Sequence, residues 1–197
     1  LFRSTAWTVF PYRMANRLIE RRNIMVAGKG YENRPLLEEE ASKICKDYFA
    51  GVDLKGKKVL CIIPDNTRSG PIDLMFKTVY GIMAGDVKYL DFLVALGTHH
   101  PMSDDTLYTF LDITEKEHNE IYPKARFFNH NCKDPSQLKL VRTLSEDEVS
   151  TLSGGLLRRK ADITINKMIF DYDLIIIIGP TFPHEAMGFS GGYKYFF

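Results

Sequence analysis

Two histidines and a lysine in short polar loops are the residues of this sequence best suited to chemistry. His99 and His184 follow, within a few residues, the apolar runs 89–96 and 174–178. Imidazole titrates near neutral pH, so each histidine can give and take a proton there. Two such rings on opposite sides of one carbon would serve a reaction that runs both ways. Lys194 follows in a glycine-rich stretch, where an amine can attract a phosphate or form a covalent bond with an electrophilic carbon.

A third polar loop, made of Asp65, Asn66, Thr67 and Arg68, follows the apolar run 59–63. An apolar stripe at helical spacing comes after it, so the loop should lie at a helix N-terminus, where free backbone N–H groups favour anions. Arg68 could fork onto a carboxylate or phosphate, with Asp65 fixing a hydroxyl or Arg68 itself. The other interpretation is a plain turn, in which the Asp and Thr side chains bond the local backbone.

The segments that must position these loops alternate between strand and helix patterns. The runs 59–63, 89–96 and 174–178 are mainly apolar, and 174–178 is also rich in β-branched residues. Such runs are typical of strands buried on both faces of a parallel sheet. Pro35 opens a helical pattern that should end near Gly51. We therefore expect an α/β fold, Rossmann-like, with a largely parallel sheet and flanking helices. Because the carboxyl ends of parallel strands share one edge, the three loops should meet there.

Shorter patterns predict further elements. Ser103 and the acidic residues after it should cap a helix over 106–111, and Thr114 with Glu117 forms a capping box for the next helix. Two more strands are predicted, at residues 126–130 and 161–166.

The chain divides into an N-terminal segment of unclear structure, residues 1–34, and one α/β domain, residues 35–197. A short helix at 15–22 is expected in the first part. With 45% hydrophobic residues, 26% charged residues and a net charge of +1, the composition favours neither nucleic acid nor an anionic membrane as partner. No apolar run approaches the roughly 20 residues of a membrane helix. The three cysteines are scattered and lack CxxC spacing, which favours a reducing cytoplasm over a disulfide framework or a zinc site.

The stretch 188–192 also matches Gly-x-Ser-x-Gly, the nucleophile elbow of serine hydrolases. An elbow serine follows its strand at once, whereas a proline-containing loop separates Ser190 from the run 174–178. The glycines could instead let the backbone approach a flat or phosphorylated ligand. A serine hydrolase using Ser190 and a non-catalytic module that binds a phosphorylated ligand therefore stay as alternatives.

Taken together, the three loops resemble one family, the nickel-pincer lactate racemases. That family carries DHTRP-like and GTHRP loops, then PH followed by GFSGGAK. This chain has, in the same order, DNTRS at 65–69, GTHHP at 97–101, and PH at 183–184 followed by GFSGGYK at 188–194. The resemblance runs from about Lys57 to the end. His100 stands where the family has arginine, and this loss of a cation leaves open which 2-hydroxy acid would be used. Asn66, Ser69 and Tyr193 also differ from the family pattern.

The resemblance implies the N-terminal domain of a two-domain racemase or epimerase of a 2-hydroxy acid. Lys194 would hold the nickel-pincer nucleotide covalently, through a thioamide. His99 and His184 would be the acid/base pair, and Asp65 and Arg68 would position the substrate carboxylate or the cofactor. The other expected cofactor contacts are Asn66, Thr67, Ser190, Gly191 and Gly192.

The resemblance also implies groups outside this sequence. The nickel-ligating histidine and the second domain, which closes the active site, are expected beyond Phe197, so no metal ligand is expected within the chain. The chain alone would then be a fragment without turnover. The proteins that synthesise the cofactor would be its upstream partners.

Overall fold

A five-stranded sheet forms the centre of the molecule, in the order β2-β8-β3-β4-β5. The computed structural model describes residues 26–185 and 188–196, together with the backbone of 6–7 and 11–12; the helix expected at 15–22 lies outside these residues. Four strands are parallel: β3 (Lys58–Pro64), β4 (Tyr89–Ala95), β5 (Ala125–Asn129) and β8 (Leu174–Ile177). The fifth, β2 (Pro11–Tyr12), runs antiparallel to β8.

The predicted α/β fold with a largely parallel sheet is confirmed. Within the sheet, β3 lies between β8 and β4, and Val59 pairs with both Leu90 and Leu174. The three apolar runs are therefore neighbouring strands, and all their central residues are buried. The strand predicted at 126–130 is β5, one residue earlier than expected.

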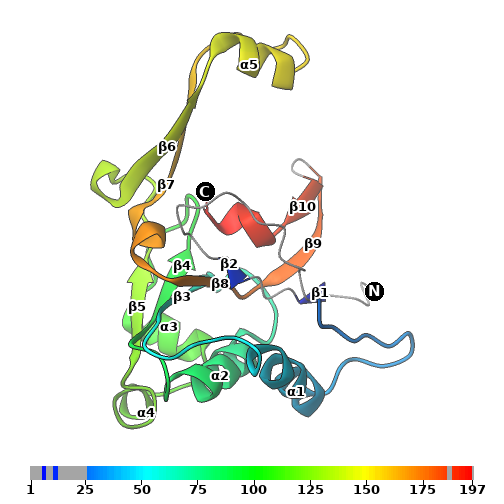
Figure 1. The fold of residues 1–197 in the computed structure, drawn as a ribbon, viewed down its shortest axis with the longest axis vertical. Coiled ribbons are helices and arrows are strands. Elements are labelled where there is room, and N and C mark those ends of the chain that lie inside the picture. Colours follow the sequence, from blue (N-terminus) through cyan, green and yellow to red (C-terminus); the bar gives the residue numbers. More distant parts are fainter. Residues whose placement is uncertain (1–5, 8–10, 13–25, 186–187, 197) are drawn as a thin grey trace.

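Helices cover one face of this sheet, and they lie together on one side of it in Figure 1. They are α1 (Glu38–Phe49), α2 (Ile72–Met83), α3 (Asp104–Phe110) and α4 (Glu115–Glu120). The core under them contains the stripe expected behind the third loop: Ile72, Met75, Val79 and Met83. Ser103 and Thr114 cap α3 and α4 as predicted. The first helix begins at Glu38 and not at Pro35, with the Glu40 carboxylate accepting a hydrogen bond from the backbone N–H of Leu37 at 3.0 Å.

The opposite face is covered by two short 3-10 turns, η2 (Lys167–Asp171) and η3 (Gly192–Phe196). Their aromatic side chains pack on a small cluster from β3, β4 and β8 that includes Leu60, Leu93 and Ile175. The glycine-rich loop therefore ends in a turn that sits on the sheet.

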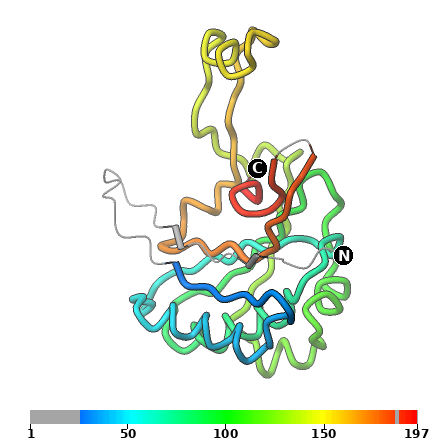
Figure 2. The backbone as a smooth tube through the Cα atoms, turned by 90° about the vertical axis from the view of Figure 1, so that its right-hand side faces the viewer, coloured from blue at the N-terminus to red at the C-terminus, as the bar shows by residue number. Residues whose placement is uncertain are grey.

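An arm projects from the body between β5 and β8, as both views show (Figures 1 and 2). It consists of η1 (Pro135–Gln137), β6 (Leu138–Leu144), α5 (Glu146–Leu152) and β7 (Ala161–Asn166). The strand predicted at 161–166 exists, but its partner is β6, and the pair forms a separate antiparallel sheet. Period-two patterns do not say which sheet a strand joins.

The last strands form a hairpin, β9 (Pro180–His184) and β10 (Gly188–Ser190). On the other side of β9 lies β1 (Ala6–Trp7). The N-terminal segment thus adds one short strand to β8 and one to β9. Among the described helices, none has the length and apolar character needed to cross a membrane.

Candidate active site at the carboxyl edge of the sheet

The loop after β3 is organised around the buried carboxylate of Asp65, which is only 4% exposed. One oxygen accepts hydrogen bonds from Thr67, at 3.2 Å from the backbone N and 2.6 Å from the hydroxyl. The other oxygen contacts Nδ1 of His99. Burial by itself raises the pKa of Asp65, but the hydrogen bonds from Thr67 and His99 outweigh it and hold the pKa below its usual value. Asp65 is therefore a carboxylate at neutral pH.

His99 lies in the loop after β4, and its side chain is 48% exposed. The loop turns at Gly97, whose φ is +56°, and the His99 backbone N–H donates to the carbonyl of Leu96 at 3.0 Å. The carboxylate partner places the ring proton on Nδ1, which leaves the lone pair on Nε2 to accept a proton from a ligand. Two loops from neighbouring strands thus build one acid/base pair.

Arg68 adds an available cation to this edge. Its side chain is half-buried, and within the described ranges its guanidinium makes no hydrogen bond or ion pair. The predicted turn is present: the Arg68 backbone N–H donates to the carbonyl of Asp65 at 3.2 Å, and Thr67 bonds the Asp65 side chain. Because the Asp65 carboxylate is used by Thr67 and His99, the guanidinium fork is left for a ligand carboxylate or phosphate.

The glycine-rich loop has its backbone shape for structural reasons. Gly191 has a φ of +82°, and a Cβ there would lie 2.0 Å from the carbonyl oxygen of Pro180. Gly188 and Gly192 also have positive φ, at +77° and +56°. A side chain at 191 would separate the loop from β9, so this glycine is required for packing as well as for the left-handed conformation.

Ser190 does not occupy a nucleophile elbow. It is 2% exposed, lies in β10, and pairs with Phe182 of β9. An elbow serine sits on a sharp strand-to-helix turn with its hydroxyl presented to solvent. The structure therefore gives no support to the serine hydrolase alternative.

Lys194 lies in η3 and is half-buried, and its backbone N–H donates to the carbonyl of Gly191 at 3.2 Å. Across the part of the chain that the structure describes, its ammonium has no hydrogen-bond or ion-pair partner. An amine in this state can react with, or bind to, a ligand without first losing an internal contact.

Tyr195, which the sequence analysis did not single out, lies beside the loop after β3. A Cβ on Gly179 would lie 2.6 Å from Cε2 of its ring, so the ring rests on the backbone at the end of β8. Burial raises the pKa of Tyr195 to about 12, with Arg68 lowering it and Asp65 raising it. Its hydroxyl is buried and finds no hydrogen-bond partner among the described residues.

His184 lies at the outer end of β9, opposite Gly188 and next to the hairpin turn. Its side chain is 24% exposed, and Nδ1 lies 3.7 Å from a carboxylate oxygen of Glu185. The hairpin rises from the end of β8 (Figure 1). The sequence predicted a loop here, whereas the structure places His184 at the end of a strand, and its pairing with His99 across one carbon stays a prediction.

His130, taken from the sequence as a hydrogen-bonding residue, has that role. Its Nδ1 lies 3.0 Å from Nδ2 of Asn166 at the base of the arm. The Asn166 Oδ1 accepts from the Met168 backbone N–H at 3.0 Å, so the NH₂ group faces the imidazole. His130 is therefore the acceptor through Nδ1 and is neutral, and burial lowers its pKa.

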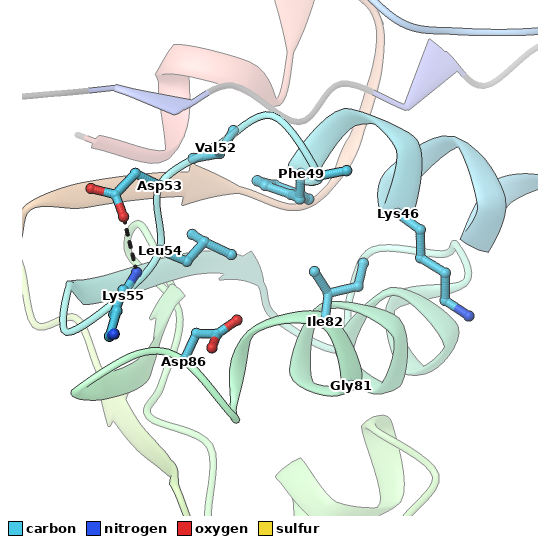
Figure 3. A pocket seen from close by; sticks show the side chains of 10 residues that line it. Lys46, Phe49, Val52, Asp53, Leu54, Lys55, Gly81, Ile82 and Asp86 are labelled. Carbon is cyan, nitrogen blue, oxygen red and sulfur yellow. Dashed lines mark hydrogen bonds between the residues drawn. The ribbon is translucent and has the colours of Figure 1, made fainter.

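Two shallow hollows differ in their relation to these residues. One, of about 310 Å³, borders the candidate site and is lined by Asn66 and by residues of α3. The other, of about 490 Å³, lies between α1, α2 and the loop 52–55, where Figure 3 shows Leu54, Ile82 and Asp86. None of the predicted site residues lines the larger hollow. In the described ranges, no three His, Cys, Asp or Glu side chains are grouped to hold a metal.

Comparisons with known proteins agree with the α/β architecture. Residues 37–197 match the family model described as the lactate racemase N-terminal domain. A crystal structure of a Thermotoga maritima protein, a structural genomics target, superposes with a TM-score of 0.71 at 31% identity. The match covers 86% of this chain and 38% of that one, so this chain spans well under half of the solved protein. A search of curated proteins found no match.

Proposed function

Since the chain belongs to the family of lactate racemase N-terminal domains, we propose that it supplies the acid/base groups and the cofactor anchor of a 2-hydroxy-acid racemase or epimerase. The observation that carries this proposal is the contact between Asp65 and His99 beside the unpaired Arg68. It combines an oriented base with an anion-binding cation at the edge where ligands of α/β sheets bind. The identity of the 2-hydroxy acid is left to experiment.

In this proposal Arg68 holds the substrate carboxylate, since its planar fork matches two carboxylate oxygens. The Nε2 atom of His99 then faces the substrate hydroxyl and accepts its proton. Asp65 keeps the ring in the correct tautomer and stabilises the imidazolium that forms. His184, on the hairpin β9–β10, serves the opposite face, so that each enantiomer meets one base.

The residues of the glycine-rich loop fit a nucleotide cofactor attached through lysine. Among the residues that the structure describes, Lys194 has no partner for its amine, and the buried hydroxyl of the adjacent Tyr195 makes no hydrogen bond. The nickel-pincer nucleotide, when bound, would supply the group that accepts and returns the substrate hydrogen as hydride. Lys194 would anchor it, while Gly191, Gly192 and the backbone of the buried Ser190 would line it, and Asn66 and Thr67 would face it from the loop after β3.

Intact-mass analysis of the full-length protein, produced together with the cofactor-synthesis proteins, tests the anchor. We expect a mononucleotide-sized addition on the peptide that contains Lys194, and its loss in a Lys194→Arg variant, which keeps the charge but cannot form the bond. Racemisation should be assayed on a panel of 2-hydroxy acids. An unmodified Lys194 in a preparation that racemises a 2-hydroxy acid would show that the lysine is only a charge contact.

A further inference from the structure

The loop that carries His99 is exposed along residues 97–100, yet it must hold the imidazole in a defined place. On the β3 side it is tied by Asp65. On the β5 side it is tied by the side chain of Asn129, which bonds both backbone groups of Met102. The Met102 N–H donates to Oδ1 of Asn129 at 3.0 Å, and Nδ2 of Asn129 donates to the Met102 carbonyl at 2.9 Å.

Asn129 belongs to the central sheet. It is the last residue of β5 and pairs in register with Val94 of β4. The next backbone N–H, that of His130, donates to the carbonyl of Val94 at 3.1 Å and extends the pairing. The Asn129 amide therefore ties the end of the His99 loop to β5, the strand paired with β4, from which the loop departs. Both ends of the loop are then fixed, at Leu96 by β4 and at Met102 by Asn129.

We propose that Asn129 is a positioning residue for His99 and acts through Met102. The His99 loop is clamped from both neighbouring strands: Asp65, after β3, sets the ring orientation, and Asn129, on β5, sets the path of the backbone. The catalytic importance of this clamp rests on the proposed function. The clamp itself is a statement about the loop and can be tested without any activity.

The amide chemistry of Asn129 is required, because the two bonds need one acceptor and one donor on the same side chain. Aspartate has a similar shape but offers only acceptors, and it places a carboxylate against the Met102 carbonyl. Asn129→Asp therefore breaks the donor half of the clamp with little change in volume. Asn131→Asp is a matched control, because the Asn131 side chain accepts a bond from the Lys133 backbone N–H at 3.0 Å, and no bond joins it to Met102.

Hydrogen exchange in the unmutated chain gives the first test and does not depend on a variant folding. The Met102 amide should exchange slowly, while the exposed amides of Thr98 and His100 exchange fast. A Met102 amide that exchanges as fast as those two overturns the clamp.

Nitrogen-15 spectra of the histidine rings give the second test. In the unmutated chain and in Asn131→Asp, the His99 ring should show a single tautomer with the proton on Nδ1. In Asn129→Asp, the His99 signals should move toward the average of both tautomers, while the His118 signals stay in place. Unchanged His99 signals in a folded Asn129→Asp chain would overturn the proposal.

Kinetics of the full-length enzyme connect the clamp to function. A small displacement of an acid/base group slows the proton transfer it performs. Asn129→Asp should therefore lower kcat about ten- to a hundred-fold with KM unchanged. If the Met102 amide is protected and the His99 ring signals behave as expected, but the enzyme racemises no 2-hydroxy acid, the clamp is supported and the proposed function is rejected. Normal kcat in Asn129→Asp with displaced ring signals would reject the positioning role.

Discussion

Two carboxylates, Asp91 within β4 and Asp65 directly after β3, each pair with a nitrogen-bearing side chain from the next strand or the loop that follows it, and they differ in how completely they are paired. Asp91, in the middle of β4, is 0% exposed and receives Nε and Nη2 of Arg126 at 2.7 and 2.6 Å, together with the hydroxyl of Tyr172. Asp65, at the end of β3, receives Thr67 and one nitrogen of His99, whose other nitrogen is open.

The difference separates a structural contact from a functional one. Both oxygens of the Asp91 carboxylate accept hydrogen bonds from within the chain. These bonds join β4 to Arg126 of β5 and to Tyr172, the residue after η2. Burial, followed by the Asp91 carboxylate, raises the pKa of Tyr172, so its hydroxyl stays a donor. Around Asp65 the contact leads to a half-exposed imidazole, and the neighbouring Arg68 guanidinium has no ion-pair partner among the described residues. Polar groups left unsatisfied at a strand edge are those that a ligand can use.

The largest effect is expected on activity, from a substitution at the contact between Asp65 and His99. His99→Gln in the full-length enzyme should lower racemisation about 10²–10⁴-fold, because an amide cannot accept and return the proton. Since the His99 side chain is half exposed, the unfolding midpoint in urea should stay within error of the parent. A full turnover rate in this variant would remove His99 from the mechanism, and a large loss of stability would make its contact with Asp65 structural.

The next effect should appear in stability and not in chemistry. Asp91→Asn keeps the shape but removes the countercharge of Arg126, and it should cost about 2–3 kcal/mol in the free energy of unfolding. A fully buried pair would cost more, but Arg126 is 53% exposed and can turn to water. Urea titration measures the loss. A variant as stable as the parent would show that the Asp91 contact is not what fastens these strands.

Two tyrosine hydroxyls, those of Tyr172 and Tyr195, allow the same comparison with the removal of one oxygen atom. Tyr172→Phe removes a bond to the buried Asp91 carboxylate and should destabilise the chain by about 1.5 kcal/mol. Tyr195→Phe removes a hydroxyl without a described partner and should be neutral or stabilising by up to about 1 kcal/mol. The same urea titration serves both. Equal losses in the two variants would mean that the Tyr195 hydroxyl is bonded in solution.

The smallest effect concerns the third polar pair, His130 with Asn166, and its dependence on pH. The pKa of His130 is lowered from its ordinary value of 6.5 by burial, so the folded chain binds fewer protons than the unfolded chain in this range. The stabilisation is complete above about pH 6.5 and is lost as the pH falls from there through the lower folded pKa. His130→Gln should reduce the fall in stability between pH 7.5 and 5. An unchanged fall would assign the pH dependence to other groups.

Much of the fold follows from local pattern. Nearly continuous apolar runs predicted the buried parallel strands, since strands covered on both faces are apolar at most positions; Asp91 in β4 is the exception. Ser103 and Thr114 determined two helix starts, because their side chains bond the free N–H groups of the first turn. The meeting of the loops after β3 and β4 followed from one rule, that parallel strands end at the same edge, while the approach of His184 to them stays a prediction.

Other features depend on residues far apart in the chain. The strand order β8-β3-β4-β5 decided which loops touch, and so brought Asp65 to His99, 34 positions away. It also brought Asn129 to Met102, and Tyr195 to the end of β8. No periodicity distinguishes β7, which pairs only within the arm, from a strand of the main sheet.

The sequence by itself therefore determined which residue types are available for chemistry and on which kind of element each one lies. The tertiary structure alone decided which of them meet, because hydrogen bonds form between neighbours in space, and neighbouring strands need not follow one another in sequence. It also decided which polar groups stay open: Asp91 and Asp65 both follow apolar residues of a buried strand, and only packing shows that one is closed by Arg126 while the other leads to an exposed imidazole.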